Sequence, residues 1–164
     1  MTDITFCVGE KVVHVPEGVC VIEEITTIRN RDSIDKEYYK LVPVMDKTSA
    51  IYVSIDTPEK YMRKLKSKKE IQEILETQKK AKPLWDANEQ RRIQKRRTAM
   101  QEDDGMEIAK LIKAYRYRRE KEHLSISDRN WLKTAEQFWF SEVAEVLGMD
   151  YETAFSVVLE TDHE

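Results

Sequence analysis

Residues 6–25, which read FCVGEKVVHVPEGVCVIEEI, constrain the fold most, because they place a β pattern at the front of a chain whose later part has helical patterns. β-branched residues dominate residues 10–15 and 19–25, as is typical of strands. Between them, the Pro-Glu-Gly sequence at 16–18 supplies the fixed φ and the permissive backbone that a tight turn requires. The segment therefore predicts a β-hairpin.

Two more strands are predicted downstream of this hairpin. A polar loop at residues 30–35 (NRDSID) is followed by β-type stretches at 38–44 and 50–55, with a turn-like stretch at 45–49 between them. Four short strands with tight connections cannot bury two faces as an open sheet. We therefore expect a small, strongly curled β-barrel of the SH3 or Tudor type in residues 1–66.

The pattern becomes helical from Ser67 onward. Ser67 with Glu70 three positions later predicts a capping box, and the apolar residues that follow repeat on one helical face. Pro83 interrupts this first helix. Further helices are expected at about residues 85–100 and 106–121, from 127 or 128 to a C-cap at Gly148, and from an N-cap at Asp150 to about 159.

The apolar residues of the helical region predict its core. One stripe each falls on the third, fourth and fifth predicted helices, at helical spacing. These stripes are Ile108, Ile112 and Tyr115; Leu132, Ala135, Trp139, Val143 and Val146; and Tyr151, Ala154, Phe155 and Val158. The fold class is therefore predicted to be α+β, with the small barrel of residues 1–66 followed by an all-α domain of about five helices in residues 67–164.

The charge of the chain is unevenly distributed. The formal net charge is -3, which argues against a protein that coats nucleic acid non-specifically, because such binding requires a broad positive field. Basic residues nevertheless cluster at Lys79, Lys80, Lys82, Arg91, Arg92, Lys95, Arg96 and Arg97, whereas every charged residue from Glu142 onward is acidic. A local basic patch is therefore expected.

Trp85 precedes part of this basic cluster. On a helix, Trp85, Arg92 and Arg96 are spaced by seven and four residues, so they can share one exposed stripe with Arg91 and Lys95 beside it. Such cations can neutralise phosphates, while a Trp can press into a minor groove and favour a distorted base step. In the alternative interpretation, Trp85 docks Leu84 against the helical core and the charges solvate a surface helix.

The strand predicted at residues 50–55 is a candidate for protein contact. Its sequence, AIYVSI, is too apolar for an edge strand that stays exposed to solvent, and an uncovered edge tends to pair with another strand. Tyr52 and Val53 are the candidate contact residues. The alternative is that the barrel itself covers both faces of this strand.

No enzymatic or metal-binding motif is visible. The three His residues are far apart, and four Gly residues leave little material for a phosphate-cradling loop. Cys7, His14 and Cys20 on adjacent strands are a conceivable ligand set, but core positions explain them more simply. We expect no catalytic residue, no metal and no cofactor. A cytoplasmic location is expected, because no signal peptide or membrane span is present and the two Cys residues form no disulfide framework.

Four stretches carry a resemblance to a known family. They are F-x-V-G-E-x-V-V-H-x-P-E-G-V-x-V-I at residues 6–22, KEYYKL at 36–41, IYVS at 51–54, and LSISD at 124–128. The chain resembles the CarD/CdnL family of bacterial transcription regulators, whose N-terminal domain is shared with the transcription-repair coupling factor. The resemblance implies a Tudor-like domain that binds the RNA polymerase β subunit and a helical domain that engages promoter DNA near the upstream edge of the transcription bubble.

The resemblance also implies roles for individual residues. Trp85 is similar to the family's wedge tryptophan, and Arg91, Arg92, Lys95 and Arg96 are similar to the basic residues that follow it. The strand of Ile51, Tyr52 and Val53 is similar to the polymerase-binding strand.

We therefore expect a non-enzymatic transcription regulator that binds RNA polymerase, contacts promoter DNA and stabilises the open complex. No membrane or small-molecule partner is expected, and the protein would join the nucleoid through the polymerase. The alternatives are a protein-only adaptor on RNA polymerase without direct DNA contact, and a small hydrolase or metal enzyme.

Overall fold

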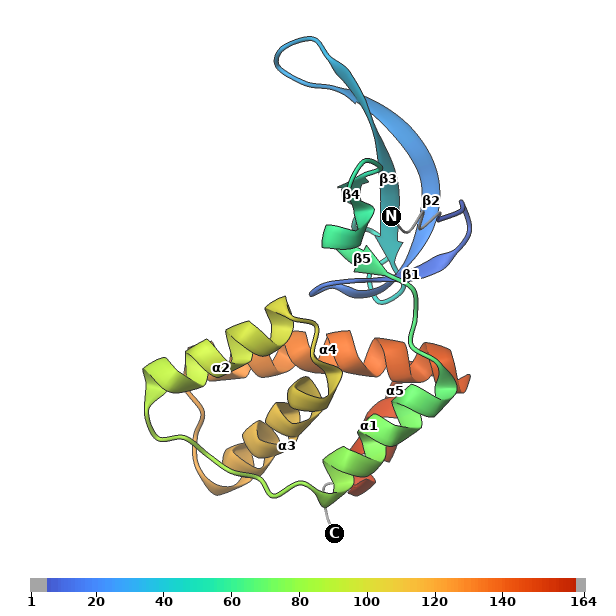
Figure 1. Cartoon of the computed structure of the whole chain (residues 1–164). Coiled ribbons are helices and arrows are strands. Elements are labelled where there is room, and N and C mark those ends of the chain that lie inside the picture. Colours follow the sequence, from blue (N-terminus) through green and yellow to red (C-terminus); the bar gives the residue numbers. More distant parts are fainter. Residues whose placement is uncertain (1–5, 162–164) are drawn as a thin grey trace. The chain divides into compact units, whose positions relative to one another are not determined.

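The computed structural model describes the backbone of residues 6–161 and the side chains of residues 6–156. The chain divides into two compact units, Met1–Leu65 and Lys66–Glu164. Strands build the first unit and helices build the second, which confirms the predicted α+β fold class (Figure 1). Among the helices that the structure describes, none is both long and apolar enough to cross a membrane.

The N-terminal unit is a five-stranded antiparallel sheet with the order β4-β3-β2-β1-β5. The strands are β1 (Lys11–His14), β2 (Gly18–Arg29), β3 (Asp35–Pro43), β4 (Ile51–Ser54) and β5 (Met62–Arg63), and a 3₁₀ turn, η1 (Pro58–Lys60), precedes β5. The four predicted strands are present. The sequence did not indicate β5, because a two-residue strand carries no alternation that a pattern can detect.

The predicted hairpin forms as β1 and β2. Gly18, at the end of the turn, has φ 94°, a conformation that a side chain would strain. β2 and β3 form a second, longer hairpin that extends beyond the other strands (Figure 1). Its loop is closed by Asn30, whose Oδ1 accepts hydrogen bonds from the backbone N–H groups of Asp32 and Ile34. A register shift between Ile22 and Glu24 marks where β2 leaves the core.

Alternating residues of the sheet form one apolar core. Its buried members are Phe6, Val12, Cys20, Ile22, Tyr39, Leu41, Val53 and Met62. Cys20 is thus a core residue, and burial raises the pKa of its thiol to about 12. Cys7 is exposed, and no group of His, Cys, Asp or Glu side chains in the described part of the chain is placed to hold a metal ion. The metal-ligand alternative for Cys7, His14 and Cys20 is therefore wrong.

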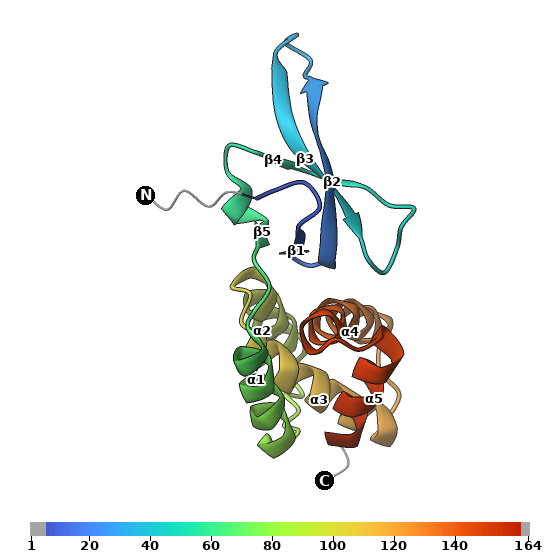
Figure 2. The same cartoon turned by 90° about the vertical axis from the view of Figure 1, so that its right-hand side faces the viewer.

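The C-terminal unit contains five helices, as predicted. They are α1 (Lys68–Lys80), α2 (Glu89–Gln101), α3 (Gly105–Lys121), α4 (Ile126–Leu147) and α5 (Tyr151–Thr161). α3 packs against α1, α2 and α4, and α5 packs along α4, which Figure 2 shows nearly end-on. The predicted capping box of Ser67 and Glu70, the αL C-cap at Gly148 and the Asp150 cap are all present.

Two helix starts differ from the prediction because of their caps. α2 begins at Glu89 and not at Trp85, since the side chain of Asn88 accepts a hydrogen bond from the N–H of Arg91 and so caps the helix. α4 begins at Ile126, since Ser125 caps it in the same way by accepting from the N–H of Asp128. Trp85 therefore lies in the segment between α1 and α2.

The core of the helical unit follows the predicted stripes. Ile108, Ile112 and Tyr115 of α3 are buried, as are Leu132, Ala135, Trp139 and Val143 of α4, while Val146 is half-buried. On α5, Ala154 is buried and Tyr151 and Phe155 are half-buried, whereas the side chain of Val158 lies outside the described residues.

Polar side chains that the sequence analysis missed tie α1 to α3. The Gln78 amide donates a hydrogen bond of 2.8 Å to the carbonyl of Ala109. The Lys113 ammonium, itself buried, donates to the carbonyls of Gln78 and Lys79 at the end of α1. Gly105 allows a close approach, because a Cβ there would lie 3.0 Å from the Cδ1 of Ile74. These contacts pair the Gln78 Nε2 and the Lys113 ammonium, whereas Oε1 of Gln78 is buried without a hydrogen-bond partner. They fix the end of α1, from which the chain continues to Trp85.

Candidate functional site

Trp85 is half-buried and is held by side chains from two helices. Its ring lies edge-on to Tyr115 of α3, with a centroid distance of 5.0 Å. The guanidinium carbon of Arg92 lies 4.5 Å from the indole centroid, and that of Arg118 lies 5.3 Å from it. We call Trp85, Arg92, Arg118 and Tyr115 the Trp85 cradle. Cation–π contacts of this kind orient a ring and keep positive charge beside it.

Asp128 anchors the cradle from the first turn of α4. Its Oδ2 lies 2.9 Å from Nη2 of Arg92, and its Oδ1 lies 2.6 Å from Nη1 of Arg96. Arg96 also donates to the hydroxyls of Ser127 and Tyr115, at 2.6 Å and 3.2 Å. Burial raises the pKa of Asp128, but the hydrogen bonds from the two arginines lower it by more, so its net pKa lies below the usual value. The carboxylate is therefore ionised at neutral pH.

The prediction that Trp85, Arg92 and Arg96 share one exposed stripe is wrong. Arg96 is only 7% exposed, and Asp128, at 2% exposed, lies beneath it. The physical reason is that the buried carboxylate of Asp128 requires cationic partners, and Arg92 and Arg96 of α2 turn toward it. Arg92 is half-buried and bound to Asp128, so it supports the ring of Trp85 and leaves only part of its surface open.

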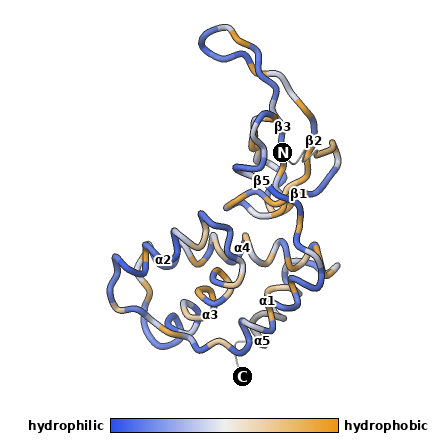
Figure 3. Tube along the Cα trace, viewed as in Figure 1, coloured by the Kyte–Doolittle hydropathy of each residue, from blue (hydrophilic) through white to orange (hydrophobic). Residues whose placement is uncertain are grey.

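Arg91 and Lys95 lie on the exposed side of α2, as predicted. The Nε of Arg91 lies 3.0 Å from Oδ2 of Asp86, and this contact holds the pKa of Asp86 below its usual range. Because the pair is exposed, it adds little stability and a phosphate can compete for the guanidinium. In Figure 3 most of α2 is coloured hydrophilic, as the exposure of these side chains requires.

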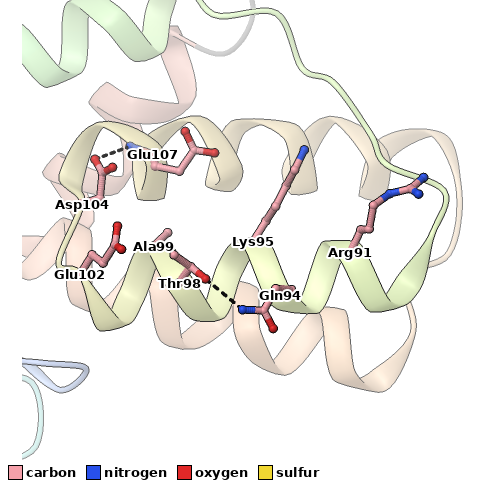
Figure 4. Close-up of a pocket in the computed structure, with 8 residues that line it drawn as sticks. All are labelled: Arg91, Gln94, Lys95, Thr98, Ala99, Glu102, Asp104 and Glu107. Carbon is pink, nitrogen blue, oxygen red and sulfur yellow. Dashed lines mark hydrogen bonds between the residues drawn. The ribbon is translucent and has the colours of Figure 1, made fainter.

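A groove between α2 and the start of α3 limits how far this basic surface extends. Its volume is about 420 Å³, and Figure 4 shows Arg91 and Lys95 at one end and acidic side chains at the other. The acidic end consists of Glu102, Asp104 and Glu107. Like charges repel a polyanion, so the acidic end of the groove disfavours contact with nucleic acid.

Arg118 is the cation that sequence reasoning missed at this site. It follows Tyr115 by three residues, so the two side chains share a helix face, and both touch the indole of Trp85. Trp85, Arg92 and Arg118 also line a surface depression of about 280 Å³ together with His123 and Ser125. The interleaved rings and cations of residues 115–119 (YRYRR) are the sequence signal that could have identified it.

The second candidate surface is the edge strand β4. Tyr52 is 47% exposed, Ile51 is half-buried, and Val53 is 3% exposed and belongs to the core. Of the two candidate contact residues, Tyr52 therefore presents an exposed side chain and Val53 faces the core. The alternative that both faces of the strand are covered is wrong, because the face that carries Tyr52 is open.

The backbone N–H and C=O of Tyr52 in β4 point away from β3. The N–H of Ile55 donates to the carbonyl of Glu37, which makes these two residues a hydrogen-bonded pair. Hydrogen-bonded and non-hydrogen-bonded pairs alternate along an antiparallel ladder, so Tyr52, opposite Lys40, is at a non-hydrogen-bonded position. Beside it, the ammonium of Lys40 lies 3.2 Å from the carboxylate of Glu23. This edge offers backbone groups, a tyrosine ring and paired charges to a partner strand.

Comparison with known protein families covers nearly the whole chain. Residues 6–66 match the family described as the CarD-like/TRCF RID domain, which is a Tudor-like fold, and residues 70–159 match the family described as the CarD C-terminal domain. A search of curated proteins finds no match to this chain. The two family matches follow each other in the same order as the sheet and the helices. The chain belongs to the CarD family of transcription regulators, which interact with RNA polymerase.

Proposed function

We propose that this protein stabilises the open promoter complex by holding the RNA polymerase β subunit through its β unit and touching promoter DNA through its helical unit. The observation that carries the proposal is the Trp85 cradle, where an indole ring at the surface is oriented by two guanidiniums and lies beside further exposed cations. The protein acts as a regulator within the cytoplasm, without a cofactor and without chemistry of its own.

The β unit supplies the polymerase contact. β4 is an edge strand whose Tyr52 backbone groups point outward, and such an edge binds an extended segment by adding it as a further strand. The exposed Tyr52 ring gives that strand an apolar contact. We infer that the β subunit provides the added strand.

The helical unit supplies the DNA contact. Arg91 and Lys95 are exposed, and the guanidinium carbon of Arg118 lies 5.3 Å from the Trp85 centroid, so the three cations can neutralise phosphates. Arg118 also pairs with Glu122 at 2.7 Å, and a phosphate competes with that exposed carboxylate for the guanidinium. Trp85 then meets sugars and base edges where the strands separate. Arg96 has a different role in this proposal: it positions Arg92 and α2 through Asp128 and does not touch DNA.

Stabilisation of the open complex requires that DNA contact be stronger in the open than in the closed state. A ring that is already oriented loses little conformational freedom on binding, which favours contact with bases that have separated. Three cations on a chain of net charge -3 give weak affinity for free duplex. Attachment to polymerase raises the effective concentration of the helical unit at the bubble and so compensates for that weakness.

The direct test is the lifetime of open complexes formed with the full-length chain and RNA polymerase. The Trp85→Ala variant should shorten this lifetime while it remains bound to polymerase. The matched control is Trp131→Ala, which removes the other indole that packs against the Tyr115 ring, with a centroid distance of 4.8 Å. This variant should lower the free energy of unfolding.

Unchanged lifetimes with Trp85→Ala on several promoters would exclude the wedge role of Trp85. If, in addition, cation variants of α2 leave the lifetime unchanged, the protein is an adaptor that binds polymerase without direct DNA contact.

A further inference from the structure

We propose that Leu84 is a second apolar side chain that enters opened DNA, beside the fixed ring of Trp85. The proposal rests on the proposed function and assigns a task to a residue adjacent to the cradle. Leu84 is 78% exposed, the largest fraction among the exposed large hydrophobic residues in the part of the chain that the structure describes. Water around an exposed leucine is released when the side chain meets an apolar surface.

The backbone around Leu84 holds the side chain outward. Pro83 precedes it and fixes its own φ, and the Leu84 N–H donates a hydrogen bond of 2.9 Å to the carbonyl of Lys82. The next residue, Trp85, is anchored on Tyr115. A side chain presented by a constrained segment pays little ordering entropy when it binds.

The surroundings of Leu84 match the chemistry of opened nucleic acid. Leu84 and Trp85 line a depression of about 170 Å³ together with Arg92, Lys95, Leu111 and Tyr115 and one acidic residue, Asp86, whose carboxylate is paired with Arg91. An apolar side chain beside cations is the combination that minor-groove proteins use, where Leu, Ile or Phe enters a base step while Arg and Lys hold the phosphates.

The geometry divides the task between two neighbours. The indole of Trp85 is contacted by the guanidiniums of Arg92 and Arg118 and by the Tyr115 ring, so it is a fixed platform. Leu84, the residue before it, is exposed over 78% of its surface and can enter the space between separated or unstacked bases. In a paired duplex the stacked bases close that space, so Leu84 contributes to binding of opened DNA and little to binding of paired DNA.

The test compares two DNA probes of one sequence, a fully paired duplex and a duplex with a central unpaired bubble, each titrated with the full-length protein. The Leu84→Ala variant should bind the bubble about fivefold to tenfold more weakly, since one buried leucine side chain is lost. Its affinity for the paired duplex and its salt slope should stay as in the wild type. Leu84→Met, which keeps an apolar side chain of similar length, should bind the bubble within about twofold of the wild type.

Met106→Ala is the matched control, because Met106 is also exposed and lies twelve residues before Arg118 on α3, roughly 18 Å along the helix axis. It should leave both affinities unchanged. Equal losses on bubble and duplex with Leu84→Ala, no loss on either, or the same loss with Met106→Ala would each overturn the role of Leu84.

The titrations distinguish an error in the role of Leu84 from an error in DNA contact by the helical unit. If Leu84→Ala binds the bubble like the wild type while an Arg91→Gln/Lys95→Gln variant binds more weakly, the Leu84 assignment is wrong and DNA contact stands. If neither variant changes binding, DNA contact by the helical unit is wrong as well.

Discussion

Nη1 of Arg96 lies 2.6 Å from Oδ1 of Asp128, and this ion pair joins the middle of α2 to the first turn of α4. The same carboxylate binds Arg92, which lies against the indole of Trp85. The orientation of a surface ring therefore depends on a buried charge on another helix. Because both arginines and the aspartate are removed from water, the contact is sensitive to the loss of any one partner.

Asp128→Asn should destabilise the protein by about 3 to 5 kcal/mol, because it leaves two arginines at the α2–α4 contact without their counter-charge. Urea unfolding followed by circular dichroism measures the change in the free energy of unfolding. The control is Asp86→Asn, which breaks the exposed pair with Arg91 and should change the free energy of unfolding by less than about 1 kcal/mol.

Equal effects of Asp128→Asn and Asp86→Asn would contradict this assignment. If Asp128→Asn is folded at low temperature, it should also shorten the open-complex lifetime, because Arg92 no longer has a fixed position under the Trp85 ring.

The pH dependence of the free energy of unfolding should also show that the pKa of Asp128 is lowered in the folded protein. Burial raises its pKa, the hydrogen bonds from Arg92 and Arg96 lower it by more, and the net pKa in the folded protein lies below the value of about 3.9 in an unfolded chain. The unfolded state therefore binds the proton more readily. The contribution of Asp128 is fully present above the unfolded pKa and is lost as the pH falls through the folded pKa.

Urea unfolding of the wild type and of Asp128→Asn between pH 7 and pH 2.5 checks this sign. The difference in free energy of unfolding between the two proteins should be constant near neutral pH and shrink only below about pH 4. A difference that is already shrinking between pH 7 and pH 5 would show that Asp128 does not have a lowered pKa.

The features that the sequence predicted correctly are those decided within a few residues. The capping box of Ser67 and Glu70, the αL cap at Gly148 and the stripe of Ile108, Ile112 and Tyr115 all follow from spacing along one helix. The hairpin at Gly18 is equally local, because a Pro and a Gly specify the turn.

The features that the sequence did not predict depend on partners far along the chain. Helical spacing placed Arg96 on the same stripe as Trp85, but Asp128, thirty-two residues later, takes its guanidinium into the interior. Lys113 is buried for a similar reason, since its acceptors are carbonyls at the end of α1. The sequence of a charged residue does not reveal whether such a partner exists. The prediction of an exposed side chain was therefore correct for Arg91 and wrong for Arg96.

Arg91→Gln/Lys95→Gln should weaken binding of the full-length chain to bubble DNA and reduce its salt slope by about one unit for each lost phosphate contact. Both side chains are exposed, so folding should be unaffected. The matched control is Lys68→Gln/Lys69→Gln at the start of α1, which removes the same charge from exposed positions away from the Trp85 cradle.

Titration at several salt concentrations by fluorescence anisotropy measures both slopes. Identical slopes for the two double variants would mean that Arg91 and Lys95 act only through net charge and make no phosphate contact.

The final prediction concerns the edge of the β unit. Tyr52→Pro removes an N–H that points away from β3, so the ladder inside the sheet stays complete. If the polymerase adds a strand at this edge, the variant should fold and lose binding to RNA polymerase, because the proline removes one donor and its ring obstructs the approaching strand. Pull-down of RNA polymerase by the full-length variant measures this loss, and thermal unfolding confirms the fold.

Two variants of the same strand separate backbone recognition from other effects. Tyr52→Ala keeps the N–H and removes only the ring, so it should weaken polymerase binding by less than Tyr52→Pro. Val53→Pro removes an N–H that faces β3 at a buried position and should unfold the unit. Wild-type polymerase binding by a folded Tyr52→Pro would contradict strand addition, since no backbone hydrogen bond from residue 52 would then be needed.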